Sequence, residues 1–158
     1  MEKDIDEWSS RPHDCIMKRD LRLRGLSSEH HHTLVFVRRI RKALQIGAAD
    51  ARFLETVRAI FEGELEPHFE IEEELLLPAL AKAGHGVLVS RTLSEHERLR
   101  NLLSTAGTGR LDALEHFASL LEEHVRFEER ELYPACEERL DTAVLDELAE
   151  RAPKRGTT

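Results

Sequence analysis

Two twelve-residue stretches, HFEIEEELLLPA beginning at His68 and HVRFEERELYPA beginning at His124, have nearly the same pattern. In each, a histidine is followed four residues later by a glutamate, Glu72 or Glu128, and the stretch ends in Pro-Ala. Residues four apart lie on one face of a helix, so each histidine and its glutamate would point in the same direction. One such pair is commonly a surface feature, but two copies at matching offsets indicate a metal site.

Two more histidines repeat in a similar way, because the tripeptide SEH ends at His30 and again at His96. Both are in phase with apolar residues of their own segments, such as Leu34 and Leu99. Together with the His-Glu pairs they give six polar side chains that we expect to face the interior of a helical protein. These six candidate metal ligands are His30, His68, Glu72, His96, His124 and Glu128.

Burying four imidazoles and two carboxylates together is costly unless they pair with one another or bind metal. Four nitrogen and two oxygen donors suit iron, manganese or zinc better than calcium or magnesium. Six protein ligands exceed the four that a tetrahedral zinc ion takes. They instead suit two ions about 3.5–4 Å apart that share carboxylates and keep open positions.

The apolar periodicity predicts the elements that position these groups. We expect helices over about 28–46, 50–83, 87–105 and 111–139, and a short fifth helix within 141–152. Ser27 or Ser28 would cap the first helix and Asp50 the second, while Pro67 and Pro78 would bend the second helix without ending it. Short turns make neighbouring helices antiparallel, which predicts an all-α, up-down-up-down four-helix bundle.

The expected inward residues include Leu34, Val37, Ile40 and Leu44 in the first helix and Leu93, Leu99, Leu102 and Leu103 in the third. Residues 1–26 would form an N-terminal arm, 27–140 the bundle, and 141–158 a short helix and tail. The length of 158 residues fits one such domain.

The charge balance bears on partners and location. The net charge of −8 argues against a nucleic-acid or anionic-membrane partner. Two cysteines give no disulfide framework, and the longest apolar run, LLLPALA, is too short to span a bilayer. The acidic start, MEKDIDEWSS, does not resemble a signal peptide, so we expect a cytoplasmic protein.

The segments SEHHH, HFEIEEELLLPAL, SEH and HVRFEERELYP together resemble the hemerythrin-like (HHE cation-binding) four-helix bundles, over roughly residues 17–140. The resemblance implies a non-heme centre of two iron ions, with zinc or manganese as alternatives. It implies as ligands the six residues named above, with Glu72 and Glu128 bridging the ions.

One position departs from the oxygen-carrying members of that family. They have a fifth histidine four residues after the first one of the third helix, where this chain has Arg100. The departure leaves one ion with an open position, unless His31, His32 or Glu73 fills it. It favours reaction with a small ligand over reversible oxygen carriage.

Three functions follow from this reading. The centre could bind, sense or react with oxygen, peroxide or nitric oxide, either as a sensor or as an enzyme. It could handle iron, because the paired His-Glu stretches also resemble iron–sulfur cluster repair proteins. Alternatively, the metal could be structural in a bundle that binds another protein, although no protein partner is identifiable.

Glu73 and Glu129 are interpreted as solvated or as lying behind the ligands, and Tyr133 as having no special role.

Overall fold

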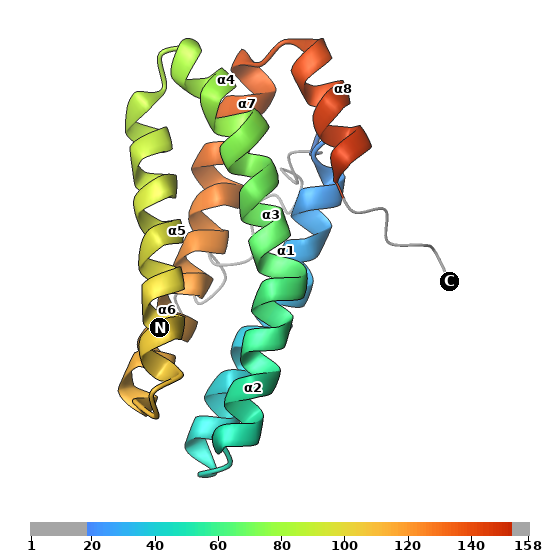
Figure 1. Ribbon diagram of the computed structural model, residues 1–158. Coiled ribbons are helices and arrows are strands. Elements are labelled where there is room, and N and C mark those ends of the chain that lie inside the picture. The colour runs from blue at the N-terminus through green and yellow to red at the C-terminus, as the bar shows by residue number, and fades with distance from the viewer. Residues whose placement is uncertain (1–18, 153–158) are drawn as a thin grey trace, which may run out of the picture.

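The structure is a computed structural model that describes residues 19–152. Over these residues it is helical, without strands, apart from short connections (Figure 1). The first helix is α1 (Arg24–Gln45) and the third is α5 (Gly86–Ala106). The second consists of consecutive segments, in which η marks a π-helical turn: α2 (Ala51–Ile60), η1 (Phe61–Leu65), α3 (Glu66–Ile71), η2 (Glu72–Leu76) and α4 (Leu77–Lys82). The fourth consists of α6 (Leu111–Phe127), η3 (Glu128–Leu132) and α7 (Tyr133–Arg139), and α8 (Thr142–Arg151) follows.

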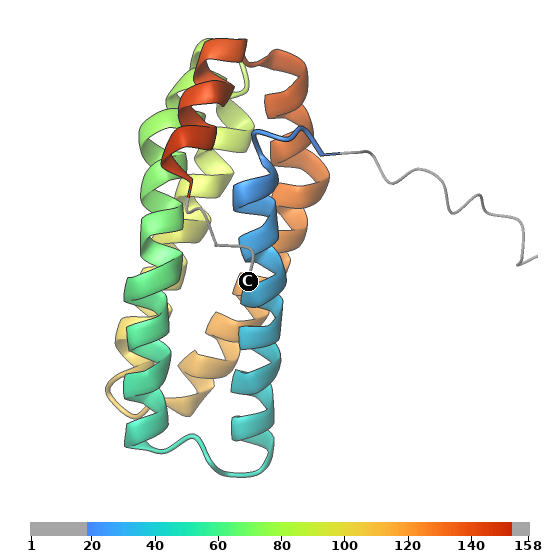
Figure 2. The ribbon, with the colours of Figure 1, turned by 90° about the vertical axis from the view of Figure 1, so that its right-hand side faces the viewer.

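The four long helices run antiparallel and form a bundle, which confirms the predicted fold class (Figures 1 and 2). Helix α6 packs against both α1 and α5, and α4 packs against α5. The short helix α8 folds back at one end of the bundle and contacts η2. The long helices therefore enclose one interior, into which each of them can direct side chains.

The helix boundaries have identifiable causes. Asp50 caps α2 as predicted, because its Oδ1 accepts a hydrogen bond of 2.8 Å from the backbone N–H of Phe53. Gly47 and Gly84 have φ of 68° and 90°, a backbone conformation that glycine adopts at little cost. Both lie in the turns that reverse the chain between successive long helices.

The first helix begins earlier than predicted, at Arg24, and neither Ser27 nor Ser28 caps it. The Ser27 hydroxyl instead donates to Glu129 Oε1 at 2.5 Å. The helix extends toward the N-terminus because Leu23 and Leu26 are buried against residues of α8 and the second and fourth helices. These two leucines fall within the expected arm, of which residues 1–18 lie outside the described part of the chain.

Each π-turn ends two residues before a proline. The N–H of the residue preceding the proline bonds the carbonyl five residues back: Glu66 to Phe61, Leu77 to Glu72, and Tyr133 to Glu128. A proline ring clashes with the carbonyl four residues earlier in a regular α-helix, and a wider turn relieves that clash. The second helix therefore continues through Pro67 and Pro78, as predicted.

The apolar core forms two clusters at opposite ends of the bundle. One contains residues such as Ile40, Leu99 and Phe117, and the other contains residues such as Leu80 and Leu148. Most inward residues were predicted correctly, but Leu93 is 43% exposed because it lies on the outer face of α5.

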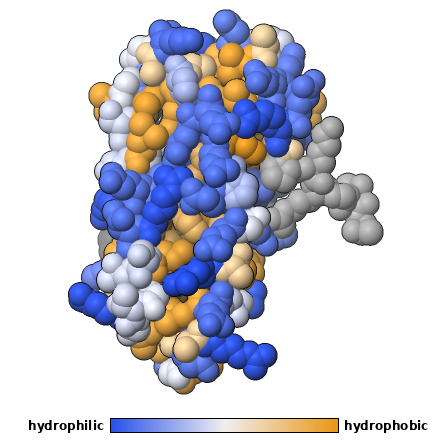
Figure 3. All heavy atoms as spheres, viewed as in Figure 1, coloured by the Kyte–Doolittle hydropathy of each residue, from blue (hydrophilic) through white to orange (hydrophobic). Residues whose placement is uncertain are grey.

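The surface mixes hydrophilic and hydrophobic residues on the face shown in Figure 3. Large exposed apolar side chains, such as Leu21, Ile46 and Val87, come from different parts of the sequence. Within residues 19–152, none of the helices combines the length and hydrophobicity needed to cross a membrane.

Candidate metal centre

All six predicted ligand side chains are buried in the interior of the bundle. His30 comes from α1, His68 from α3, His96 from α5 and His124 from α6. Glu72 and Glu128 are the first residues of η2 and η3, so each carboxylate lies at the start of a π-turn. The sequence thus predicted which residues meet, although their role as ligands stays a prediction.

The histidines form two pairs, one from each helical hairpin. His30 Nε2 and His68 Nε2 lie 3.3 Å apart. The rings of His96 and His124 have centroids 4.9 Å apart. The pairs are connected by Glu128, whose Oε2 lies 2.9 Å from His30 Nε2 and whose Oε1 lies 2.8 Å from His124 Nε2.

Glu72 connects the same two pairs from the opposite hairpin. Its Oε1 lies 3.4 Å from His68 Nε2, and its Oε2 lies 3.4 Å from His96 Nε2. Each carboxylate therefore directs one oxygen toward each histidine pair. This is the arrangement that two cations sharing two bridging carboxylates require.

Several donor atoms of this cluster are buried and approach one another as close nitrogen–oxygen pairs, but they form no hydrogen bond of regular geometry. They are Glu72 Oε2, both carboxylate oxygens of Glu128, and Nε2 of His96 and His124. Buried polar atoms are costly when they are left unsatisfied, and a bound cation would satisfy all of these together. Donors within 4.8 Å of one another fall into two groups that share Glu128, so the residues present fit two cations.

A glutamate stands behind each of the four imidazoles and bonds its Nδ1, on the side away from the cluster. The pairs are His30 with Glu129 at 2.7 Å, His68 with Glu29 at 2.7 Å, His96 with Glu73 at 2.8 Å, and His124 with Glu95 at 2.7 Å. An Nδ1–H that donates to a carboxylate leaves the Nε2 lone pair free to bind metal and fixes the ring. The duplicated SEH tripeptides contain Glu29 and Glu95, so the signal for these two residues was present in the sequence.

Three of the four glutamates are themselves held by arginines: Arg19 bonds Glu129, Arg91 bonds Glu95, and Arg100 bonds Glu73. The guanidinium of Arg100 also lies 2.6 Å from Glu66 Oε1. Arg100 therefore points away from the donor cluster and supports the glutamate behind His96.

The other proposed substitutes for a fifth histidine also lie outside the cluster. His31 and His32 are exposed on α1. Glu73 binds His96 Nδ1 and Arg100, which places its carboxylate behind the imidazole.

The family assignment agrees with this geometry. The sequence profile of the Hemerythrin HHE cation binding domain matches residues 22–136, which is more than half of the chain. The chain belongs to this family. The chain is 32% identical over 99 residues, 58% of its length, to uncharacterized proteins of Mycobacterium tuberculosis and Mycobacterium bovis. The match spans 60% of the length of these relatives, and no solved structure is significantly similar.

Tyr133 is a residue of the HHE domain centre that the sequence interpretation missed. It is fully buried, and its hydroxyl donates to Glu72 Oε1 at 2.8 Å. The hydroxyl oxygen of Tyr133 also lies 3.3 Å from His30 Nε2 and 3.4 Å from His68 Nε2. Burial and the charges of Glu72 and Glu128 raise the pKa of Tyr133 well above its usual value. No duplication pointed to it, because this is the only tyrosine of the chain.

In the HHE domain without a metal ion, protonated histidines pair with the carboxylates of the cluster. Burial opposes a charged His124, but the Glu128 carboxylate outweighs it and raises the pKa of His124 to about 10. Burial likewise opposes the charge of Glu129, but hydrogen bonds with His30 and Ser27 lower the pKa of Glu129 to about 2. Protons and metal ions therefore compete for the same imidazoles.

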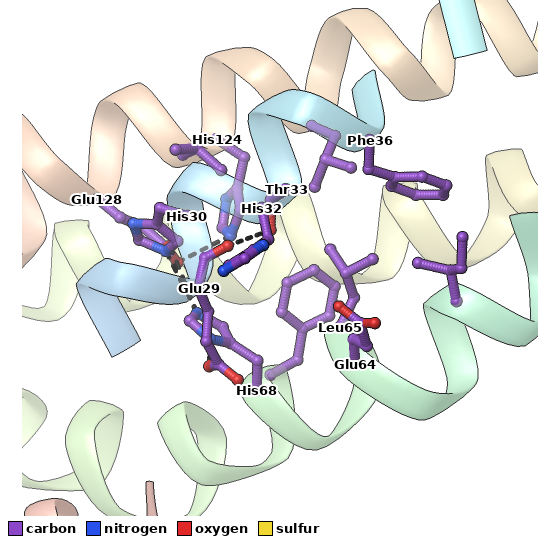
Figure 4. Close-up of a pocket in the computed structure, with 14 residues that line it drawn as sticks. Glu29, His30, His32, Thr33, Phe36, Glu64, Leu65, His68, His124 and Glu128 are labelled. Atoms are coloured by element: carbon purple, nitrogen blue, oxygen red, sulfur yellow. Dashed lines mark hydrogen bonds and ion pairs between the residues drawn. The ribbon is translucent and has the colours of Figure 1, made fainter. Parts of the chain in front are cut away.

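A small pocket leads from the surface to the cluster (Figure 4). It lies between α1 and the segment formed by η1 and α3, with exposed His32 and Glu64 and buried His68 and Glu128 among its lining residues. Its volume is about 20 Å³, and a water molecule needs about 10–15 Å³, so the pocket can hold a molecule of that size.

Proposed function

We propose that this HHE domain holds two iron ions in the six-residue cluster and binds, senses or reacts with a small oxidant or with nitric oxide. The observation that carries the proposal is that Glu72 and Glu128 each direct one oxygen toward each histidine pair. A single ion would use only one side of each carboxylate. Two adjacent ions would use both sides, and with two histidines each they would keep positions for exchangeable ligands.

The choice of iron follows from the donors. Imidazoles and carboxylates together suit iron, manganese and zinc, and of these iron is the one best suited to redox chemistry with oxygen, peroxide or nitric oxide. Two bound iron ions would supply the electrons for such chemistry. Manganese and zinc remain alternatives that metal analysis separates from iron.

The chain's own residues position the donors and control access to them. The four glutamates behind the imidazoles hold the rings in place and keep each Nε2 directed inward. The two apolar core clusters on either side limit the access of water. The pocket beside His68 and Glu128 offers an approach for a molecule little larger than water, such as a diatomic molecule or peroxide. That approach favours a reactive centre over a closed structural one.

Metal analysis of tag-free protein, loaded anaerobically with ferrous iron, tests the proposal. We expect about two iron ions per chain and an absorption spectrum that changes on addition of oxygen, peroxide or nitric oxide. Glu72→Ala should lose at least one ion, because this carboxylate faces both histidine pairs. Glu70→Ala is the matched control, since Glu70 is exposed on the same helix.

Two results would contradict the proposal. Protein that takes up no transition metal has no such centre. A colourless zinc protein that does not respond to small ligands would instead support a structural metal.

A further inference from the structure

One of the differences between the two halves of the HHE domain lies directly beside the cluster. Tyr133 follows His124 by nine residues, and the corresponding residue nine after His68 is Leu77. Both side chains are buried at the start of a helical segment that follows a π-turn. The tyrosine therefore adds a polar atom to the cluster from one half only, and the proposed function gives it no role.

The position of its hydroxyl matches that of a metal ligand. Tyr133 Oη, His30 Nε2 and His68 Nε2 form a nearly equilateral triangle with sides of 3.3, 3.3 and 3.4 Å. Donors bound to one ion at about 2.1 Å lie about 3.0 Å apart in octahedral and about 3.4 Å apart in tetrahedral geometry. The three atoms are thus spaced as neighbouring ligands of a single ion.

The surroundings hold the phenol in that place. Its ring stacks on His30, with centroids 5.3 Å apart and an angle of 11° between the planes. The guanidinium of Arg19 also lies over this ring, 5.5 Å from its centroid. The remaining contact of the hydroxyl is with Glu72 Oε1, which is itself a donor of the cluster.

We propose that Tyr133 is the fifth protein ligand of the ion held by His30 and His68. It would not bind the ion held by His96 and His124. The inference rests on the proposed function, because it requires iron in the cluster. When the bond between Oη and the ion forms, the phenol proton leaves to solvent, so a ferric ion and a neutral tyrosine give a ferric phenolate and one proton. Burial keeps the free phenol protonated. A bound cation has the opposite effect and favours loss of the proton.

The two ions would then differ. The ion at His30 and His68 would have two nitrogens and three oxygens from the protein, and its partner two nitrogens and two oxygens. The anionic phenolate stabilises the ferric state, so the first ion should be the harder to reduce. The partner would keep more positions for small ligands.

Resonance Raman spectroscopy of the iron-loaded, oxidised protein tests the assignment. A ferric phenolate gives a visible charge-transfer band whose excitation enhances the vibrations of the tyrosine ring. The chain contains one tyrosine, so any such vibration comes from Tyr133. We expect these vibrations, and we expect them to shift when the protein is grown with ring-deuterated tyrosine. This measurement needs no variant.

Tyr133→Phe provides the second test. It should remove the charge-transfer band while metal analysis still finds about two iron ions. Leu77→Phe, at the corresponding position of the other half, should keep the band. Two bound iron ions without tyrosine vibrations in the wild type would overturn the inference and leave the proposed function standing, with the phenol as a hydrogen-bond donor to Glu72. Absence of iron would overturn both.

Discussion

At each of the four histidines of the cluster, the glutamate that bonds Nδ1 comes from a different helix than the histidine itself. The partner of a ligating imidazole sets the ring's orientation and raises the basicity of the nitrogen that binds the ion. The position of each donor thus depends on how two helices pack, and in a metal-loaded protein the carboxylates behind the imidazoles would matter almost as much as the donors themselves.

Glu95→Gln should weaken metal binding while the fold is retained. The amide can still accept the hydrogen bond from His124 Nδ1, but the negative charge is lost. Removal of such a partner typically lowers metal affinity about 10–100-fold. Competition with a chelator of known affinity measures the change, and Glu97→Gln, exposed on the same helix, is the control. Equal affinities in the two variants would show that Glu95 does not act on the centre.

The stability of chelated protein should have a pH maximum. The pKa of His124 is raised from 6.5 to about 10, so its contribution is complete below pH 6.5 and is lost as the pH rises through about 10. The pKa of Glu129 is lowered from 4.5 to about 2, so its contribution is complete above pH 4.5 and is lost as the pH falls through about 2.

Melting curves of the chelated protein between pH 2 and pH 10, the range that these two pKa values span, check this prediction. The melting temperature should be highest between the two unshifted values and should fall toward alkaline pH. His124→Gln should flatten the alkaline fall, whereas substitution of the exposed His116 should not. An alkaline fall that persists in His124→Gln would assign the effect to other groups.

The helices themselves carry a local irregularity at the centre. The π-turns η2 and η3 begin at Glu72 and Glu128, and each ends two residues before a proline. The extra residue in a π-turn shifts the directions in which the following side chains point around the helix axis. Tyr133 follows η3 directly, so its direction toward the cluster depends on that turn.

Two glycines in helical segments should respond in opposite ways to a larger side chain. A Cβ on Gly25 would lie 3.0 Å from Ala152 Cβ, whereas one on Gly63 would meet nothing within 4 Å. Gly25→Val should lower the stability by about 1–3 kcal/mol through overpacking between the start of α1 and the end of α8. Gly63→Ala should raise it by about 0.4–1 kcal/mol by restricting the unfolded chain. Denaturant titration measures both values, and a stable Gly25→Val would show that α8 can move aside.

The sequence was informative where it repeats. The bundle follows from the apolar periodicity, and the six donors follow from the two copies of each His-containing stretch. A single copy of either stretch would not have supported a metal site. Features that occur once, such as Tyr133, carried no such signal. The early start of α1 was missed because Leu23 and Leu26 are buried by α8, far away in the sequence, and not by a local pattern.

For the whole molecule, metal binding and folding should be coupled. The donors come from all four long helices, so only the folded chain brings them together. A ligand that binds only the folded state stabilises it by about 2.7 kcal/mol at a hundredfold excess over its dissociation constant. Chelation should therefore lower the melting temperature, and metal should restore it. An unchanged melting curve after verified metal removal would place the metal outside the core.

The two hairpins also exchange partners, since Glu129 of the second supports His30 of the first and Glu73 of the first supports His96 of the second. Two separate copies of one hairpin could build the same cluster as a symmetric dimer. In such a dimer, a residue placed beside one ion is necessarily placed beside the other as well. A single chain is free of that constraint. The difference between Tyr133 and Leu77 is an asymmetry that a symmetric dimer of identical hairpins could not have.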